Sequence, residues 1–453
     1  MELTQSLKSA VQAFWDIQKE SIKKNKEKLF FKNSNNEEFV VMMHLLLDDM
    51  ITTGIAIKKF ERDTSVSEGT LFSNIKDLTK YVLDNNTGSG EVVESIKISI
   101  AMLPPEYQEF MKQLFTKTFK CGATLKTVNK AFGEEVIPEF SCQLAHPYEK
   151  HVGKVKGKSF TLTRKLDGYR LQCLIDVKNE KVEFFTRKGK PILGLNQLSN
   201  EVWSFVQTNN LQESQFLFEN GIYFDGEAVL VDPTGKLSET ELFQATSKVM
   251  RADGEKHNVK FSLFDFMSVS EFMVDKTSIL SYGERRESLE SLSYDNVKLV
   301  DLVEKLYQGT DTNEVDRLME EVSKPNGWEG LMLNIDEAKY QCKRTADLLK
   351  IKQFYYADIP VIDVYEGDKG KKYEDMMGGA VCQFKDFTID IGSGWTDEQR
   401  KEYWSEPSRL IGQMVEIQYQ GETINEKGGK GLRFPTLQRL RPDKTIEDIS
   451  YES

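Results

Sequence analysis

The stretch Lys165-Leu166-Asp167-Gly168-Tyr169-Arg170 decides how the fold and chemistry of this chain are interpreted. Lys165 lies at the end of a predicted strand, and the acid, glycine and arginine that follow suit a lysine nucleophile attacking a phosphorus atom. The amine of such a nucleophile must be neutral at the moment of attack, which nearby cations or a bound metal favour. Asp167 can hold a ribose hydroxyl or a metal ion, Gly168 permits close backbone approach, and Arg170 offers a forked pair of donors to sugar or phosphate.

Further motifs of the same character lie downstream: Phe224-Asp225-Gly226-Glu227, Leu263-Phe264-Asp265-Phe266, Glu329-Gly330-Leu331-Met332 and Leu349-Lys350-Ile351-Lys352. Glu227 and Glu329 come from different predicted strands, and carboxylate oxygens placed in that way suit a hard cation such as magnesium. Lys350 and Lys352 point to one face of a strand, where both can contact a phosphate. Phe264 can stack on a base. Taken singly, the acids fit solvated strand residues and Phe264 fits a core aromatic, but the ordered set favours a nucleotide site.

The 453 residues are too many for one ordinary domain, and the pattern of residues divides them into three parts. Residues 1–133 carry apolar residues at spacings of three and four and predict an all-α domain. Residues 134–353 carry short β-rich runs with intervening helices and predict an antiparallel-rich α+β domain, in which Asp232-Pro233-Thr234-Gly235 is expected to form a hairpin turn. Residues 354–453 carry short strands between Gly-rich turns and predict a small β-barrel.

The amino-acid composition limits which cellular compartment and which binding partners fit this chain. No apolar run approaches the roughly 18 residues of a membrane span, and the N-terminus lacks the apolar core of a signal peptide, so we expect a cytoplasmic protein without membrane contact. The five cysteines are scattered without any metal-ligand spacing, which disfavours structural zinc and fits a reducing compartment. With 60 Lys and Arg against 72 Asp and Glu, the net charge of −12 argues at face value against a nucleic-acid partner.

Together with Phe185 to Lys190 and Arg441-Pro442-Asp443-Lys444, these motifs resemble those of covalent lysyl-nucleotide transferases: DNA ligases, RNA ligases and mRNA capping enzymes. Capping enzymes usually carry an Asp at the position of Glu329 and a proline at that of Gln353. The Arg441 to Lys444 stretch is similar to a motif of ATP-dependent DNA ligases that RNA ligases generally lack. The resemblance is closest to the DNA ligases of T-even-like bacteriophages, and it covers most of residues 110–445.

The resemblance implies a helical DNA-binding domain (1–133), an ATP-grasp-like nucleotidyltransferase domain (134–353) and an OB-fold (354–453), with Lys165 as the nucleophile. The implied nucleotide-binding residues are Thr163, Arg170, Arg187, Glu227, Phe264, Lys350, Lys352, Arg441 and Lys444, and the implied ligands of Mg²⁺ or Mn²⁺ are Asp167, Glu227 and Glu329. Two positions depart from the family pattern. Asn334 stands where the family has Lys or Arg, and Thr163 stands where an acid or amide often reads adenine.

The implied activity is ATP-dependent sealing of 5′-phosphate/3′-hydroxyl nicks in duplex DNA through lysyl-AMP and DNA-adenylate, in DNA replication, repair and recombination. Positioning and charge neutralisation dominate phosphoryl transfer, which accounts for motifs of lysines, arginines and acids without histidine. The alternatives are an mRNA capping guanylyltransferase, an RNA ligase and a non-catalytic nick-binding protein.

The distribution of charge along the chain points to a different partner from the one that the net charge suggests. Residues 111–130 contain no acid, and we predict a cationic DNA track that includes Lys112, Lys117, Lys120, Lys126 and Lys130. For the segment from Leu237 to Lys256, binding to a sliding clamp is one hypothesis, and an ordinary surface helix is the preferred one. We expect a monomer, located in the host bacterial cytoplasm if the protein is phage-encoded.

Overall fold

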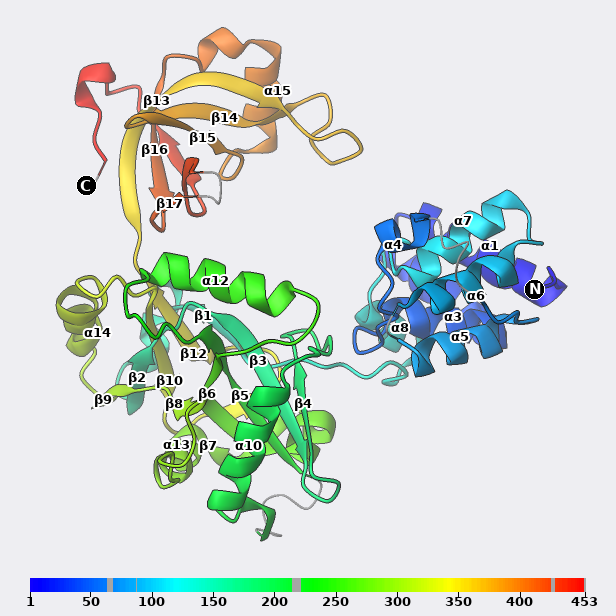
Figure 1. Cartoon of the computed structure of the whole chain (residues 1–453). Helices are drawn as coiled ribbons and strands as arrows, with labels where there is room; N and C mark the ends of the chain where they lie inside the picture. Colours follow the sequence, from blue (N-terminus) through cyan, green and yellow to red (C-terminus); the bar gives the residue numbers. More distant parts are fainter. Residues whose placement is uncertain (63–67, 87, 214–220, 425–427, 452–453) are drawn as a thin grey trace.

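The computed structural model describes residues 1–62, 68–86, 88–213, 221–424 and 428–451, which form a helical part, a central part and a C-terminal β part (Figure 1). The helical part contains α1 (Gln5–Lys19), α2 (Lys23–Lys32), α3 (Glu37–Leu47), α4 (Ile57–Glu61), α5 (Ile75–Asp84), α6 (Gly90–Ile100), α7 (Pro105–Phe115) and α8 (Leu125–Phe132). In α1, Thr4 caps the N-terminus by accepting from the Leu7 amide, and an apolar stripe faces inward. Phe14 from this stripe packs against Phe39 of α3 with ring centroids 4.8 Å apart. The all-α prediction is confirmed.

The central part contains two five-stranded sheets. The first sheet has the order β1 (Leu144–Pro147), β12 (Arg344–Lys352), β10 (Gly330–Ile335), β2 (Phe160–Arg164) and β9 (Lys305–Gly309). The second sheet has the order β4 (Lys181–Phe185), β3 (Tyr169–Asp176), β5 (Ile222–Leu230), β6 (Val259–Ser268) and β8 (Val300–Leu302). The central part also contains the small β7–β11 pair (Thr277–Ser281 and Lys339–Gln341) and, among its helices, α9 (Val152–Val155), α10 (Asn196–Thr208), α12 (Glu239–Arg251), α13 (Tyr282–Glu290) and α14 (Asn313–Leu318). Most strand pairs are antiparallel, as predicted.

The segment from Lys165 to Gly168 crosses from one sheet to the other. It leaves β2, which lies between β10 and the edge strand β9 of the first sheet, and enters β3 of the second, so that Lys165 lies where the two sheets approach each other. A side chain at Gly168 would meet the Glu227 Cγ at 2.8 Å, so glycine is required for this close crossing. The strand and turn chemistry of this one segment thus fixes the position of the lysine.

The turn at residues 232–235 is present, but it does not close a hairpin. The Asp232 carboxylate accepts from the backbone amides of Thr234 and Leu237, both at 2.8 Å, and the chain then enters α12, whose N-terminus has a Ser238/Glu241 capping box. The hairpin prediction was wrong because turn residues specify a reversal of the chain and carry no information about the element that follows it.

The C-terminal part contains one antiparallel sheet and a helix. The sheet has the order β15 (Phe387–Ile391), β14 (Met377–Phe384), β13 (Tyr355–Glu366), β16 (Met414–Tyr419) and β19 (Thr436–Leu440), beside α15 (Asp397–Ser405) and the pair β17 (Glu422–Ile424) and β18 (Lys430–Leu432). An isolated bridge between Ser393 and Thr436 joins the two ends of the sheet, as a small barrel requires. The predicted barrel is confirmed. The exact domain boundaries, after residues 133 and 353, stay predictions.

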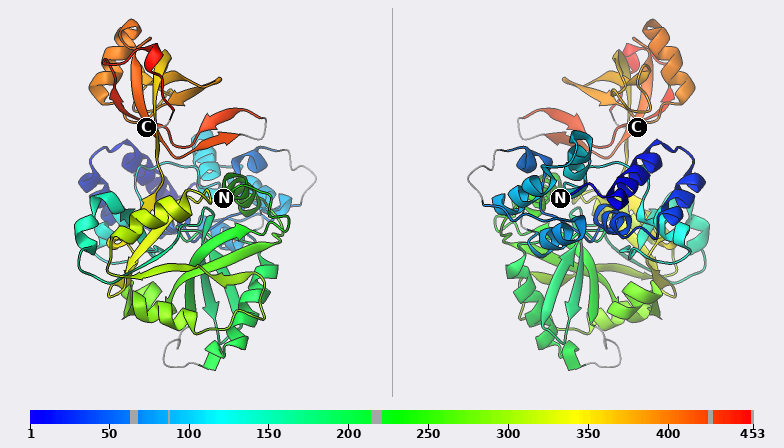
Figure 2. Two further views of the ribbon diagram at one scale, coloured as in Figure 1. Left: turned by 90° about the vertical axis from the view of Figure 1, so that its left-hand side faces the viewer. Right: turned by 90° about the vertical axis from the view of Figure 1, so that its right-hand side faces the viewer.

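The C-terminal part touches the central part through a few polar contacts. It follows β12 directly, and α12 is on the side of the central part that faces it (Figures 1 and 2). The Gln244 amide donates to the Ile424 carbonyl at 3.2 Å, and the Lys352 Nζ donates to the Gln420 side chain at 3.2 Å. Along the ranges described here, no helix has the length and apolar character needed to cross a membrane.

Candidate active site

A cavity of about 320 Å³ lies where the two central sheets meet, and side chains from both sheets line it. Most of the residues predicted for the nucleotide site line this cavity, namely Thr163, Lys165, Arg170, Arg187, Glu227, Phe264, Lys350 and Lys352. They come from segments separated by up to almost 190 positions, so the folding of the sheets, and not sequence proximity, gathers them. The cavity can accommodate a small charged ligand such as a nucleotide.

Lys165 is held in place by Glu329. The Lys165 amide donates to the Gly330 carbonyl at 2.9 Å, and its ammonium forms an ion pair with the Glu329 carboxylate. Lys352 pairs with the same carboxylate at 2.8 Å. Burial opposes ionisation of Glu329, but the two lysines outweigh it and hold the pKa of this carboxyl below its ordinary value. Glu329 is therefore the counter-ion of two cavity lysines.

The pKa of Glu227 is shifted upward, in contrast to that of Glu329. It lies opposite Arg170 in the β3–β5 register. Burial raises its pKa from 4.5 to about 7, although Lys165 and Arg170 act against the rise. A carboxyl group of this kind gains or loses a proton near neutral pH.

Arg170 is fixed on two sides. Its Nε and Nη2 donate to the two Asp225 oxygens at 2.6 and 2.5 Å, and its guanidinium lies 4.6 Å from the centre of the Phe264 ring. Asp225 is completely buried and receives a third hydrogen bond from the Tyr340 hydroxyl at 2.6 Å. Sequence reasoning missed Asp225 and Tyr340 as parts of the site. The position of Asp225 inside the Phe224 to Glu227 motif was the signal for the first; Tyr340 lies in no recognised motif.

The three predicted metal ligands are not gathered together. Asp167 forms a bidentate ion pair with Arg433 of the C-terminal part, including an Nη2 to Oδ1 contact of 2.9 Å, and it does not line the cavity. Glu329 is engaged by lysines, and within the described ranges no three His, Cys, Asp or Glu side chains form a metal-binding group. Glu227 remains a suitable ligand, because magnesium is often held by one or two carboxylates together with substrate phosphates.

Lys350 and the two positions that depart from the family pattern also face the cavity. Burial, with Lys352 and Arg344 nearby, lowers the pKa of Lys350. Thr163 on β2 is buried and pairs with Met332 on β10, and Asn334 lines the cavity from the same strand β10. This end of the cavity therefore presents a hydroxyl and an amide.

Arg441 and Lys444 lie away from the cavity. Arg441 pairs with Asp358 at 3.0 Å and with Glu416 at 3.1 Å, and Lys444 pairs with Asp358 at 2.6 Å. Both cations therefore gather around one buried acid, Asp358, of the C-terminal part. In this arrangement of the parts they do not line the predicted nucleotide site.

The five lysines of the predicted DNA track are in different situations. Three pair with acids, namely Lys112 with Glu61 of α4 and with Glu109 of its own helix α7, Lys126 with Glu139, and Lys130 with Glu27. Lys120 is exposed. Lys117 turns inward: its Nζ donates to the carbonyls of Asp48 at 2.6 Å and Ile51 at 2.7 Å, and burial lowers its pKa. This position corrects the expectation that Lys117 contributes to a surface track.

A cavity lysine between two mainly antiparallel sheets, with further lysines and acids around it and a C-terminal barrel, defines a nucleotidyltransferase of the covalent type. The model of the "ATP dependent DNA ligase domain" family matches residues 140–352, and that of the "DNA ligase OB-like domain" matches residues 369–441. Together the two matches cover well over half of the chain. The chain belongs to the ATP-dependent DNA ligase family.

Individual relatives agree with this assignment. The DNA ligase of Enterobacteria phage T4 is 23% identical over 428 residues, which cover 83% of this chain and 80% of that protein. The DNA ligase of the archaeon Sulfurisphaera tokodaii is 25% identical over 378 residues, covering 72% of this chain and 59% of that protein. A solved structure titled "Pmar-Lig_PreS3" has the same fold, with a TM-score of 0.69, 24% identity and coverage of 97% of this chain and 100% of that one. The resemblance to DNA ligases is confirmed, and the capping-enzyme and RNA-ligase alternatives are not favoured.

Proposed function

We propose that this chain seals nicks in duplex DNA and that Lys165 carries the adenylate. The assignment of Lys165 rests on its position in a cavity that is also lined by two further lysines and four arginines, and on its ion pair with the Glu329 carboxylate. Three transfers follow from this role. The Lys165 nitrogen attacks the α-phosphorus of ATP and pyrophosphate leaves; the 5′-phosphate oxygen of the nick then takes the AMP; finally the 3′-hydroxyl displaces AMP and closes the strand.

The cavity residues supply binding and charge neutralisation for these transfers. Lys350 and Lys352 lie on one face of β12 and neutralise the charge that builds up on the α-phosphate. Arg170 and Arg187 bind the sugar and phosphates, and Phe264 provides an apolar face for the base. Burial raises the pKa of Glu227 to about 7, so this carboxyl can take up the proton that Lys165 must lose before a cation binds to it.

A divalent cation fits one part of the site. Glu227 would hold Mg²⁺ or Mn²⁺ together with phosphate oxygens of ATP, and the cation would supply further neutralisation of the phosphate charge. Asp167 and Glu329 remain predicted ligands, although each carries an ion pair in the present arrangement. Arg441 and Lys444 would orient the pyrophosphate once the C-terminal part has rotated over the cavity.

The partner we propose is nicked double-stranded DNA, bound by a monomer in the cytoplasm. DNA phosphates would be contacted by Lys112, Lys120, Lys126 and Lys130. For the three of these lysines that form ion pairs, the phosphate would replace the carboxylate. The five free and buried cysteines support a reducing compartment. Sliding-clamp binding stays untested; the contacts of α12 with the C-terminal part through Gln244 and Phe243 support an ordinary helix instead.

Labelling with ATP tests the assignment of Lys165. The protein incubated with α-labelled ATP and magnesium should acquire one acid-labile, phosphoramidate-linked AMP, and Lys165→Ala should form none. Lys178→Ala, which removes an exposed lysine outside the motifs, is the matched control and should label as the unaltered protein does. Labelling of Lys165→Ala at the normal level would exclude Lys165 as the nucleophile. Sealing of a nicked DNA duplex, compared with the same duplex carrying RNA at the nick, then tests the substrate.

A further inference from the structure

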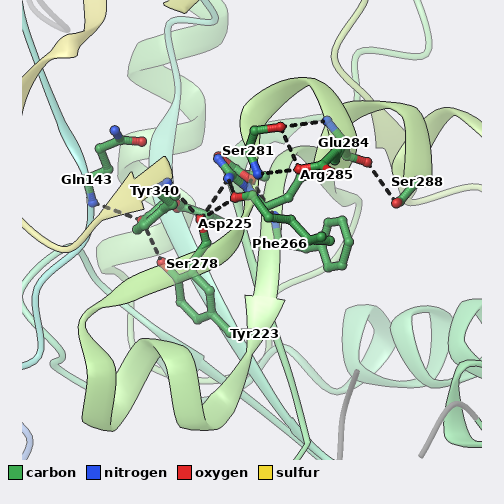
Figure 3. Close-up of polar contacts among 12 residues, drawn as sticks. Gln143, Tyr223, Asp225, Phe266, Ser278, Ser281, Glu284, Arg285, Ser288 and Tyr340 are labelled. Carbon is green, nitrogen blue, oxygen red and sulfur yellow. Dashed lines mark hydrogen bonds and ion pairs between the residues drawn. The ribbon is translucent and has the colours of Figure 1, made fainter. Parts of the chain in front are cut away.

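A buried polar network forms part of the wall of the nucleotide cavity, and Tyr340 is at its centre (Figure 3). The Tyr340 hydroxyl donates to Asp225 at 2.6 Å and accepts from the Gln143 amide at 2.9 Å. Asp225 in turn holds Arg170 through both of its carboxylate oxygens. The Arg170 guanidinium also donates to the Gln143 carbonyl at 3.3 Å, which closes a ring of contacts around it.

Each tyrosine hydroxyl has a single proton to donate, and this limit shows which hydrogen bonds in the network form. Burial raises the pKa of the Tyr340 phenol well above its ordinary value, so the hydroxyl keeps its single proton. The Asp225 carboxylate is the strongest acceptor within reach and lies at the shortest distance. Tyr223 lies 3.2 Å from Tyr340 but also donates to the Gln172 side chain at 2.8 Å, so its one proton has another acceptor. Tyr340, and not Tyr223, therefore holds Asp225 directly.

The contacts with Asp225, Gln143 and Phe264 determine the direction in which the Arg170 guanidinium points. Asp225 is completely buried, and the Phe264 ring covers one face of the guanidinium, so rotation of Arg170 would leave a buried carboxylate without its partner. Arg170 and Tyr340 both line the cavity, and Tyr340 belongs to β11 of the small β7–β11 sheet, which lies between the motif that ends at Met332 and the motif that begins at Leu349. The backbone of Gln143, which binds both side chains, belongs to the segment that leads in from the helical part.

We propose that Tyr340 is a positioning residue for nucleotide binding, which acts through Asp225 to orient Arg170 toward the sugar and phosphates of ATP. The inference rests on the proposed role of the cavity in forming lysyl-AMP. A pre-oriented arginine loses less conformational entropy when ATP binds and makes its two hydrogen bonds without rearrangement. Removal of the Tyr340 hydroxyl should therefore weaken ATP binding more than it slows the transfer to Lys165.

The decisive variant is Tyr340→Phe, which removes one oxygen and keeps the ring. We expect the KM for ATP in lysyl-AMP formation to rise by roughly fivefold to twentyfold, while the maximal rate falls by less than about threefold. The Arg170→Lys background provides a second readout, because lysine cannot make the forked contact with Asp225. If Tyr340 acts through Arg170, Tyr340→Phe should add little to the KM of that variant.

Two other tyrosine-to-phenylalanine changes separate positioning from stability. Tyr282→Phe removes a buried hydroxyl that has no hydrogen-bond partner among the described residues, so stability and KM should both stay unchanged. Tyr223→Phe removes the bond to Gln172 and should lower Tm about as much as Tyr340→Phe does, but it should leave the KM within about twofold of normal. If Tyr340→Phe does not fold, Asp225→Asn serves as the second variant, because it keeps the shape of the carboxylate and should raise the KM in the same way.

The outcomes distinguish this inference from the proposed function. If the unaltered protein forms no lysyl-AMP, the proposed function fails. If it forms lysyl-AMP, but Tyr340→Phe, or Asp225→Asn in its place, leaves the KM unchanged or shifts it no more than Tyr223→Phe does, the positioning role is wrong and the function stands. A selective rise in KM that disappears in the Arg170→Lys background supports the inference.

Discussion

At the scale of single residues, Glu227 links the chemistry of the site to the stability of the fold. Burial holds its pKa at about 7 in the folded chain, against 4.5 as the ordinary value. Between these two pH values the unfolded chain releases a proton that the folded chain keeps, so stability should fall as the pH rises through this window. Glu227→Gln removes the titration, and at pH 8 we expect it to raise the free energy of unfolding by about 2 kcal/mol relative to the unaltered protein.

Thermal unfolding at pH 5 and pH 8 measures this effect. The Tm of Glu227→Gln should exceed that of the unaltered protein by several degrees at pH 8 and by much less at pH 5, although lysyl-AMP formation is impaired. Glu287→Gln, at an exposed position on α13, is the control and should follow the unaltered protein at both pH values. Equal Tm differences at pH 5 and pH 8 would show that Glu227 does not titrate in this window.

At the scale of helices and strands, Lys117 distinguishes a structural role from DNA binding. Its ammonium caps the carbonyls of Asp48 and Ile51 just after α3. Lys117→Ala should lower the stability of the helical part by about 1–3 kcal/mol, because buried carbonyls lose charged donors. Lys120→Ala, at an exposed position, should leave Tm unchanged and weaken DNA binding. Thermal melts and nicked-DNA binding of both variants test this assignment, which would be refuted by a normal Tm for Lys117→Ala together with weaker DNA binding.

The local sequence pattern predicted the helices and strands well, but it did not predict which distant residues the side chains on them contact. Apolar spacing identified the helical part, and the motif from Lys165 to Arg170 identified the crossing between the sheets. The side chains of most motif residues then met in one cavity, because each motif lies on or beside a strand of the two sheets. The acids that pair with Lys112, Lys126 and Lys130 all lie outside residues 111–130, so a count of charge within that stretch could not reveal them. The position of Tyr340 could not be predicted either, because its partners lie 115 and 197 residues away.

At the scale of the whole molecule, the arrangement of the parts separates two groups of predicted residues. Arg433 of the C-terminal part holds Asp167 next to the nucleophile segment, while Arg441 and Lys444 remain around Asp358. The residues proposed for binding pyrophosphate are thus outside the cavity while the residues proposed for binding the nucleotide are inside it. Because few polar contacts join the parts in this arrangement, rotation of the C-terminal part would break few interactions.

The net charge of −12 makes the salt dependence of DNA binding a test of the whole molecule. An acidic protein can bind DNA only if its cations are concentrated on one surface, and binding must then release counter-ions from several phosphates. We expect the affinity for nicked duplex to fall with salt, with a log–log slope of about −0.9 for each phosphate contacted. The slope should become less steep by about one unit in Lys120→Ala and stay unchanged in Lys178→Ala. An affinity independent of salt would exclude a cationic track on this chain.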